Sequence, residues 1–298
     1  MPEVPAELPL AHDRFAALVA DLRPELHRYC SRLVGSAIDG EDVVQESLAK
    51  AFYALSLSPE VPPLKPWLLR IAHNTAIDFL RRYERRFVEP VAEPPELAGP
   101  DPEVELPGAR VAALSSFLAL PVLQRSAVIL KDVLDCSLED IASTVGTTVP
   151  AVKAALVRGR RALQAQPAPD VVPWRDRPET TAGEKALLER YVALFNAKDW
   201  HAVEALLAEE CRLDLLSRSQ RRGKAQVRLY FTNYAKAPVR LALGTAEGRA
   251  VIGVYGQRAT PDYVISLDWD GDRVALIRDY RYVPYLMDQL DYEPGERT

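Results

Sequence analysis

The sequence predicts a multidomain protein, with two all-α domains (a helical bundle, then a helix-turn-helix) followed by an α+β domain. Apolar residues recur at three- and four-residue steps through the first half of the chain, which is the period of a helix. Runs typical of strands appear only after residue 238. Residues 88–108 and 167–183 are rich in proline and acidic residues and are typical of extended linkers. We therefore expect domains at 10–87, 109–166 and 184–298.

The composition is that of a water-soluble globular protein, with 48% apolar and 27% charged residues. No apolar run is long enough to span a bilayer, and the first residues do not form a secretory signal. The three cysteines are far apart, and neither they nor the four histidines have the spacing of a disulfide framework or a metal site. We expect a cytoplasmic protein with no metal, no cofactor and no membrane segment.

The first block is helical throughout. Asp39 is the predicted N-cap of a helix that begins GEDVVQESLAKAFYAL. Four prolines between Ser56 and Pro66 predict a non-helical loop, after which WLLRIAHNTAIDFLRRYERR returns to helix.

Basic residues are concentrated in two places, although the net charge is −5. Residues 65–86 contain six basic and two acidic side chains, and residues 148–166 contain four basic side chains and no acidic one. Local basic stripes on an acidic chain are typical of DNA-binding proteins, but solvated helix faces would give the same pattern. Charge alone leaves both interpretations open.

Residues 137–163 have the pattern of a helix-turn-helix. Ser137 is a predicted N-cap, Gly146 can end the first helix in the left-handed conformation, and Thr148 is a predicted N-cap for the second helix. The second helix has one apolar stripe and an outward face with basic residues. An ordinary helical hairpin is the alternative, but the combination of features favours DNA binding.

Three segments resemble those of RNA polymerase sigma factors of the extracytoplasmic-function kind, and they occur in family order over about residues 10–166. DGEDVVQESLAKAFYAL resembles the polymerase-binding helix, and WLLRIAHNTAIDFLRR resembles the helix that contacts the −10 promoter element. The helix-turn-helix, which closes with VKAALVRGR, resembles the domain that contacts the −35 element. A lone helix-turn-helix is weakly diagnostic, whereas three ordered segments are specific.

The resemblance implies DNA contacts on both basic helices. On the first helix, a helical wheel places one set on a common face: Arg70, Asn74, Arg81, Arg82 and Arg85. Arginines there would hold phosphates and Asn74 would contact a base, while Asp78 either contacts a base or pairs with a neighbouring arginine. The loop Ser56–Pro66 would help to capture an extruded base.

On the second basic helix, the residues expected to contact the −35 element are Thr147, Thr148, Lys153, Arg158 and Arg161. Positions 154 and 155 are both alanine, where many relatives carry serine and arginine. We therefore expect phosphate contacts and duplex shape to carry more of the recognition.

The resemblance also implies that an acidic helix binds core RNA polymerase. The residues expected at that surface are Asp39, Glu41, Asp42, Gln45 and Glu46. From the residues alone, a solvated helix face would be the preferred interpretation.

The third block begins with predicted helices Glu184–Ala197 and Trp200–Ala208, and a third helix is expected over Gly223–Tyr234. Strand-like runs follow, with Asp270-Gly271-Asp272 as a hairpin turn between the last two. This order resembles the SnoaL-like cone fold, a curved sheet around a pocket. Candidate pocket residues are Asp214, Tyr230, Tyr255, Asp268, Trp269 and Asp279.

No evident acid–base set stands out in the third block, so a regulatory domain, which could respond to an unknown small ligand, is favoured over an active site. The predicted partners are core RNA polymerase and promoter DNA, and the chain itself is not expected to be an enzyme. Two alternatives stay open. One is a ligand-responsive DNA-binding regulator that acts without polymerase, and the other is an isomerase- or cyclase-like enzyme fused to a DNA-binding domain.

Overall fold

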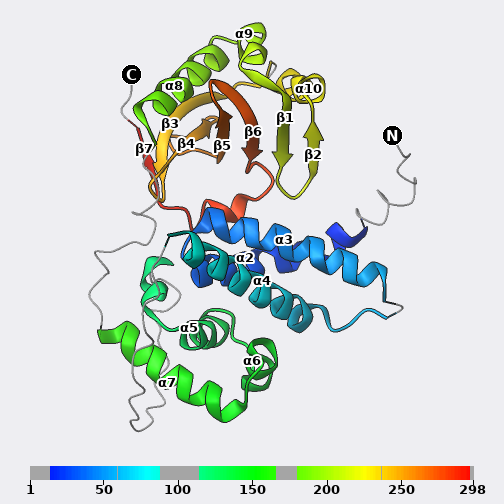
Figure 1. The fold of residues 1–298 in the computed structure, drawn as a ribbon, viewed down its shortest axis with the longest axis vertical. Helices are drawn as coiled ribbons and strands as arrows, with labels where there is room; N and C mark the ends of the chain where they lie inside the picture. Colours follow the sequence, from blue (N-terminus) through cyan, green and yellow to red (C-terminus); the bar gives the residue numbers. More distant parts are fainter. Residues whose placement is uncertain (1–13, 59, 88–113, 166–179, 236, 296–298) are drawn as a thin grey trace. The chain divides into compact units, whose positions relative to one another are not determined.

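The computed structural model describes residues 14–58, 60–87, 114–165, 180–235 and 237–295. The chain divides into two compact units, Met1–Pro173 and Trp174–Thr298. Both predicted helical blocks belong to the first unit, and the predicted α+β block belongs to the second (Figure 1). The linker predicted at 88–108 and most of that predicted at 167–183 lie outside the described residues.

After a helical segment at residues 14–19 and a 3-10 helix (Ala20–Leu22), the first unit has three long helices, α2 (Arg23–Val34), α3 (Ala37–Ser56) and α4 (Leu64–Phe87). Gly35 ends α2 with a φ of 79°, in the left-handed region that suits glycine. Ser36 follows it as the N-cap of α3, and its side chain accepts a hydrogen bond from the Asp39 N–H at 3.0 Å. The prediction that Asp39 is the N-cap was therefore wrong, because Ser36 already caps the helix one turn earlier.

The start of α4 also differs from the prediction. The helix begins at Leu64, so Pro66 lies inside its first turn rather than in the preceding loop. A proline costs little there, because the first N–H groups of a helix have no partner within it.

The rest of the first unit holds the helix-turn-helix and the segment before it. The elements are a 3-10 helix (Leu114–Ala119), α5 (Val122–Val128), a π-helical turn (Ile129–Val133), α6 (Leu138–Val145) and α7 (Val149–Ala165). The predicted caps are confirmed. Ser137 accepts from the Asp140 N–H, Gly146 has a φ of 71°, and Thr148 accepts from the Ala151 N–H at 3.4 Å.

One continuous apolar core joins the two helical blocks. It contains Tyr29 and Leu33 of α2, Leu68 of α4, and Phe117 and Ile129 from the second block. Arg125 of α5 crosses between the blocks and donates to the Leu33 carbonyl at 2.6 Å. The two blocks are thus a single packed body in this structure.

Two buried histidines tie α2 to its neighbours as neutral side chains. A His27 ring nitrogen lies 2.9 Å from the Ala37 carbonyl, and Tyr29 Oη lies 2.8 Å from His73 Nδ1. Burial lowers the pKa of each histidine to about 4. They therefore act at neutral pH through hydrogen bonds and not through charge.

Among its described residues, the second unit has three α-helices, α8 (Ala182–Asn196), α9 (Trp200–Ala205) and α10 (Lys224–Ala235), and a 3-10 helix (Pro284–Leu286). Its seven strands are β1 (Leu207–Leu215), β2 (Ser219–Arg222), β3 (Arg240–Ala246), β4 (Arg249–Tyr255), β5 (Tyr263–Asp270), β6 (Arg273–Asp279) and β7 (Tyr292–Pro294). They form one sheet in the order β2-β1-β6-β5-β4-β3-β7, in which β1 and β6 are parallel. The predicted turn at Gly271–Asp272 is confirmed by the pairing of Asp270 with Arg273.

The three helices of this unit pack on one face of the sheet (Figure 1). Tyr191 and Phe195 of α8 and Tyr230 of α10 meet Leu213 of β1 and Ile277 of β6 in one core. The predicted fold class, two all-α blocks followed by an α+β cone-type domain, is confirmed by this order of helices and strands.

Candidate nucleic-acid interface

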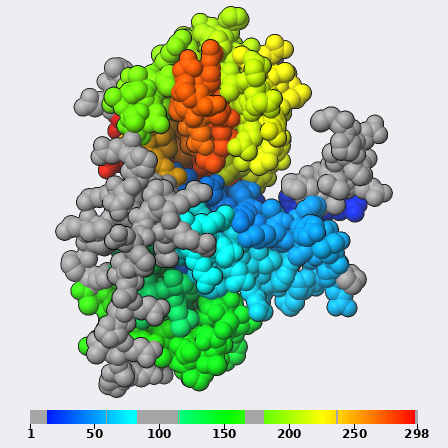
Figure 2. Space-filling model, viewed as in Figure 1, coloured from blue at the N-terminus to red at the C-terminus, as the bar shows by residue number. Residues whose placement is uncertain are grey.

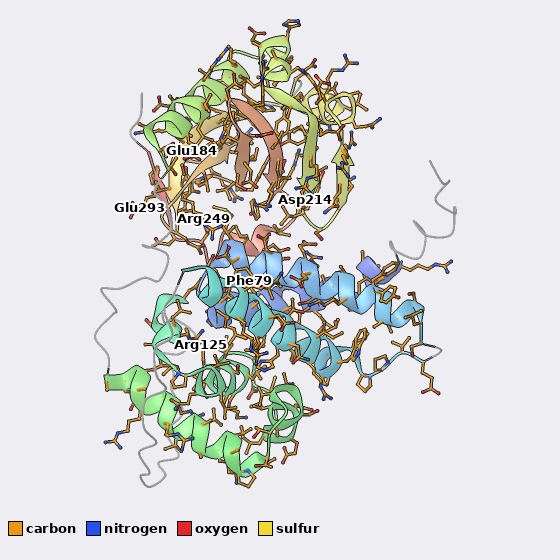
Figure 3. The ribbon with its side chains drawn as sticks, in the orientation of Figure 1. Phe79, Arg125, Glu184, Asp214, Arg249 and Glu293 are labelled. Carbon is orange, nitrogen blue, oxygen red and sulfur yellow. The ribbon has the colours of Figure 1, made fainter. Side chains whose placement is uncertain are left out.

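The polar face predicted on α4 is present on the surface. Arg70, Asn74, Asp78, Arg81 and Arg82 are all exposed. The opposite side carries the apolar residues that hold the helix in place, including buried Leu68 and Ala72 and half-buried Phe79 (Figure 3). The side chain of Arg85 lies outside the described residues. Helical periodicity produces this separation, because residues three and four apart share a face.

Arg82 links this face to α3. Its guanidinium donates to Glu46 Oε2 at 2.9 Å, and its Nε donates to the main-chain carbonyl of Asp78 at 3.3 Å. Of the two neighbouring arginines with which Asp78 could pair, Arg82 therefore has its ion pair with Glu46 instead. Lys50 approaches the same carboxylate at 2.9 Å. Partial burial raises the pKa of Glu46, but the bonds and charges of Lys50 and Arg82 outweigh it, so that the pKa is lowered overall.

The acidic residues of α3 do not all have the same surroundings. Glu41 is buried, and its Oε1 accepts from Arg23 of α2 at 2.8 Å and from Gln45 at 2.7 Å. Asp39 is also buried, whereas Asp42 is half-buried. Among the five predicted residues, Glu41 therefore interacts with α2 and Glu46 interacts with α4.

On the helix-turn-helix, Thr148, Lys153 and Arg161 are exposed, and Thr147 and Arg158 are half-buried. All five therefore have surface available for DNA. The neighbouring Arg160 instead makes two bonds to Asp132, at 2.5 and 3.0 Å, and so braces α7 against the π-helical turn.

The two alanines of α7 have different roles. Ala154 is exposed, whereas Ala155 is fully buried beside Val152 and Leu156. Close packing of α7 on α5 explains the small residues on this side, because a Cβ on Gly159 would come within 2.8 Å of Val128. An arginine at position 155 would have to displace that packing, so of these two positions only 154 lies on the exposed surface of α7.

The candidate pocket residues of the second unit do not form one site. Asp279 Oδ2 accepts from Tyr230 at 2.7 Å and from Tyr234 at 2.9 Å, while Tyr234 also lies 2.8 Å from the Tyr263 hydroxyl. Tyr255 instead meets Tyr292, with 2.9 Å between their hydroxyls.

The other candidates lie away from this tyrosine–aspartate cluster (Tyr230, Tyr234, Tyr263 and Asp279). Leu215 pairs with Asp279 in the β1–β6 register, so the adjacent Asp214 points to the opposite face of the sheet, where Gln220 donates to it at 3.3 Å (Figure 3). Asp268 is exposed and lies 3.5 Å from Arg278. Trp269 packs at the edge of the core.

Asp279 is completely buried, and a third hydrogen bond to it comes from the Arg281 N–H, which donates to Oδ1 at 2.8 Å. Burial raises the pKa of this carboxyl, and the hydrogen bonds from Tyr230, the Arg281 N–H and Tyr234 oppose that rise only in part. Both oxygens are engaged and no solvent reaches them, which is an arrangement that stabilises a fold.

Several important residues were not identified from the sequence. Arg125, Lys50, Tyr234 and Tyr263 act through partners distant in the chain, and no local pattern marks them. Among the described residues, no cluster of three or more histidine, cysteine or carboxylate side chains could hold a metal ion. No helix in the described part of the chain is long and apolar enough to cross a bilayer.

Two family models match the chain, Sigma-70 region 2 over residues 18–86 and Sigma-70 region 4 over residues 111–163. The ECF RNA polymerase sigma factor SigG of Mycobacterium tuberculosis is 29% identical, over 88% of this chain and 79% of its own length.

Among solved structures, that of the extracytoplasmic function sigma factor SigJ of Mycobacterium tuberculosis covers 90% of this chain and 95% of its own, at 21% identity and a TM-score of 0.34. The epoxide hydrolase/cyclase-like enzyme SalBIII covers 32% of this chain and 87% of its own, at 18% identity and a TM-score of 0.26. The two family models and SigG agree: the chain contains sigma-70 regions 2 and 4 and is similar over most of its length to extracytoplasmic-function RNA polymerase sigma factors, which direct core polymerase to specific promoters.

Proposed function

We propose that α4 contacts the −10 element, that α7 contacts the −35 element, and that α3 binds core RNA polymerase in the cytoplasm. The observation that carries this proposal is the exposed polar face of α4, where Arg70, Asn74 and Arg81 lie on one side of a helix whose other side is buried. Arginines on such a face suit the phosphates of a separated strand, and the Asn74 amide can both donate to and accept from one base.

We expect Asn74→Ala to lower run-off transcription from a cognate promoter about tenfold, because one base contact contributes roughly 1–3 kcal/mol. The exposed side chain cannot be needed for the core, so the fold should be unchanged. Arg28→Ala on α2, which is equally exposed, is the control and should transcribe normally. Normal transcription by Asn74→Ala would contradict the assignment of α4.

The polymerase surface is proposed to use the half-buried acidic side chains of α3, with Asp42 and Glu46 as its centre. Glu41 accepts from Arg23 of α2 and from Gln45, so it fixes the position of the helix against α2. Asp39 lies in the first turn, where its charge is favourable to the helix N-terminus.

The second unit is proposed to regulate the sigma factor and not to catalyse a reaction. The complete burial of Asp279, the only candidate carboxylate within the tyrosine–aspartate cluster, supports this proposal, because a general base must reach its substrate. A small ligand elsewhere in the unit is compatible with that role.

Removal of the second unit tests the regulatory role. A chain that ends at Pro173 keeps the continuous core of the first unit, so it should still bind core polymerase. We expect its run-off transcription to differ at least severalfold from that of the full chain. Equal transcription at equal occupancy of core polymerase would remove the regulatory proposal. Failure of either protein to associate with core polymerase would instead favour a polymerase-independent regulator.

A further inference from the structure

The second unit has a strongly basic corner that none of the roles above uses. Between residues 212 and 228 the sequence has six basic residues and one acidic residue, Asp214. The six, named here the basic corner, are Arg212, Arg218, Arg221, Arg222, Lys224 and Arg228. They belong to the β1–β2 hairpin and to α10, which pack together at one edge of the sheet (Figure 1). The yellow α10 is visible on the surface in Figure 2.

Two pairs of these like charges are neighbours, at a cost in stability. Arg212 and Arg222 are direct cross-strand partners in the β1–β2 register, and like charges in that position are destabilising. Lys224 and Arg228 are one turn apart near the start of α10, where the helix dipole disfavours positive charge and no acidic residue occupies the first turn. Charges that oppose local stability without a structural reason indicate a function.

Neighbouring acids neutralise the basic corner only in part. Arg222 lies 3.6 Å from Glu210 and Lys224 lies 3.4 Å from Glu209, and both carboxylates are more than four-fifths exposed. Such exposed ion pairs contribute little to stability. Within the described part of the chain, Arg212, Arg221 and Arg228 have no hydrogen bond or ion pair with another side chain.

One member of the corner is also held in a fixed orientation. The guanidinium of Arg218, in the β1–β2 turn, lies 4.7 Å from the centre of the Tyr282 ring. Stacking on an aromatic ring orients the planar donors of arginine and lowers the entropy lost when they bind a phosphate.

We infer that the basic corner binds the phosphate backbone of DNA, without sequence preference, when the sigma factor is on a promoter. A polyanion with regularly spaced phosphates complements several arginines spread over a hairpin and a helix, and counterion release makes such contacts favourable. The second unit would then add a third DNA contact to those of α4 and α7. This inference uses the sigma-factor identity of the chain but does not depend on the regulatory proposal.

The test is the salt dependence of promoter binding by holoenzyme assembled from core polymerase and the full chain. Fluorescence anisotropy with labelled promoter DNA would be measured between about 50 and 200 mM salt. The test variant is Arg212→Gln/Arg222→Gln/Arg228→Gln. We expect its slope of log K for DNA binding against log salt concentration to fall in magnitude by about 2–3, because each lost phosphate contact lowers that slope by about 0.9. Affinity at the lower salt should fall at least tenfold.

Two further variants make the result specific. Lys185→Gln/Arg190→Gln/Arg258→Gln removes the same charge from exposed positions elsewhere in the unit and should leave the slope unchanged. Arg212→Lys/Arg222→Lys/Arg228→Lys keeps the charge and should restore most of the slope. Thermal unfolding should show that all three variants fold.

Three outcomes would overturn the inference. An unchanged slope in the glutamine variant would show that these residues do not meet phosphates, and an equal change in the control would show a general charge effect. A lower affinity of the glutamine variant for core polymerase, with the DNA slope intact, would assign the basic corner to an acidic protein surface instead.

Discussion

Asp279→Ala is expected to lower the free energy of unfolding of the second unit by about 3–5 kcal/mol. The change removes the acceptor of two buried tyrosine hydroxyls, Tyr230 and Tyr234, and of the part-buried Arg281 N–H. Each buried donor that loses its partner costs roughly 1–3 kcal/mol, and the void left by the carboxyl group adds to that. Urea unfolding followed by tryptophan fluorescence measures the loss, and hydrogen exchange locates it in α10 and β6.

Asp279→Asn is the informative companion. The single carbonyl oxygen of the asparagine can still accept from both tyrosines, but its amide nitrogen then faces the Arg281 N–H. Because one hydrogen bond is lost, we expect the free energy of unfolding to fall by about 1–2 kcal/mol. Asp268→Ala is the control, since that carboxylate is exposed and has one ion pair at 3.5 Å. It should cost less than about 1 kcal/mol. Equal stability of wild type and Asp279→Ala would contradict the structural role of the cluster.

The pH dependence has a defined sign. Because burial raises the pKa of Asp279 in the folded state, the folded state binds its proton more tightly than the unfolded state does. The contribution of Asp279 to folding stability is therefore complete at a pH below the pKa that its carboxyl has in the unfolded state. That contribution is lost as the pH rises through the pKa that the carboxyl has in the folded state. The difference in free energy of unfolding between wild type and Asp279→Asn should accordingly become smaller as the pH is raised from the acidic range.

The features that the sequence predicts correctly are local ones. Ser137, Gly146 and Thr148 mark the ends of α6 and α7 through bonds within three or four residues of each residue. The position of the exposed polar face of α4 follows from the period of the helix alone. Such features depend on neighbouring residues in the chain, which a sequence displays directly.

The features that were missed depend on long-range packing or on an unusual local pattern. Strand β2 has the sequence SQRR, with no apolar alternation, and exists because β1 lies beside it. The parallel pairing of β1 with β6 joins segments about sixty residues apart. Tyr234 and Tyr263 also meet only in the folded unit. No periodicity encodes these contacts, and so the candidate pocket was scattered over residues that the structure separates.

Arg125→Ala is the second change with a large expected effect, and it concerns the first unit. Arg125 is buried, and its guanidinium donates to the carbonyls of Leu33, Leu118 and Leu120 at 2.6, 3.0 and 3.0 Å (Figure 3). Leu33 lies at the C-terminal end of α2, where the helix dipole favours a positive charge. Loss of the side chain leaves two buried carbonyls and one part-buried carbonyl without this donor. It also opens a void between α2 and α5, so we expect the free energy of unfolding to fall by about 3–4 kcal/mol.

The matched variants separate hydrogen bonding from charge. Arg125→Lys keeps a cation at the end of α2, but an ammonium group lacks the planar, forked donors needed to reach all three carbonyls. The loss in free energy of unfolding should therefore be roughly half that of Arg125→Ala. Arg28→Ala removes an exposed arginine of α2 and should change stability by less than about 0.5 kcal/mol. Hydrogen exchange should show faster exchange in α5 and in the last turn of α2, while the middle of α3 keeps its protection. Uniform exchange across the unit, or wild-type stability of Arg125→Ala, would show that the apolar core alone joins the two helical blocks.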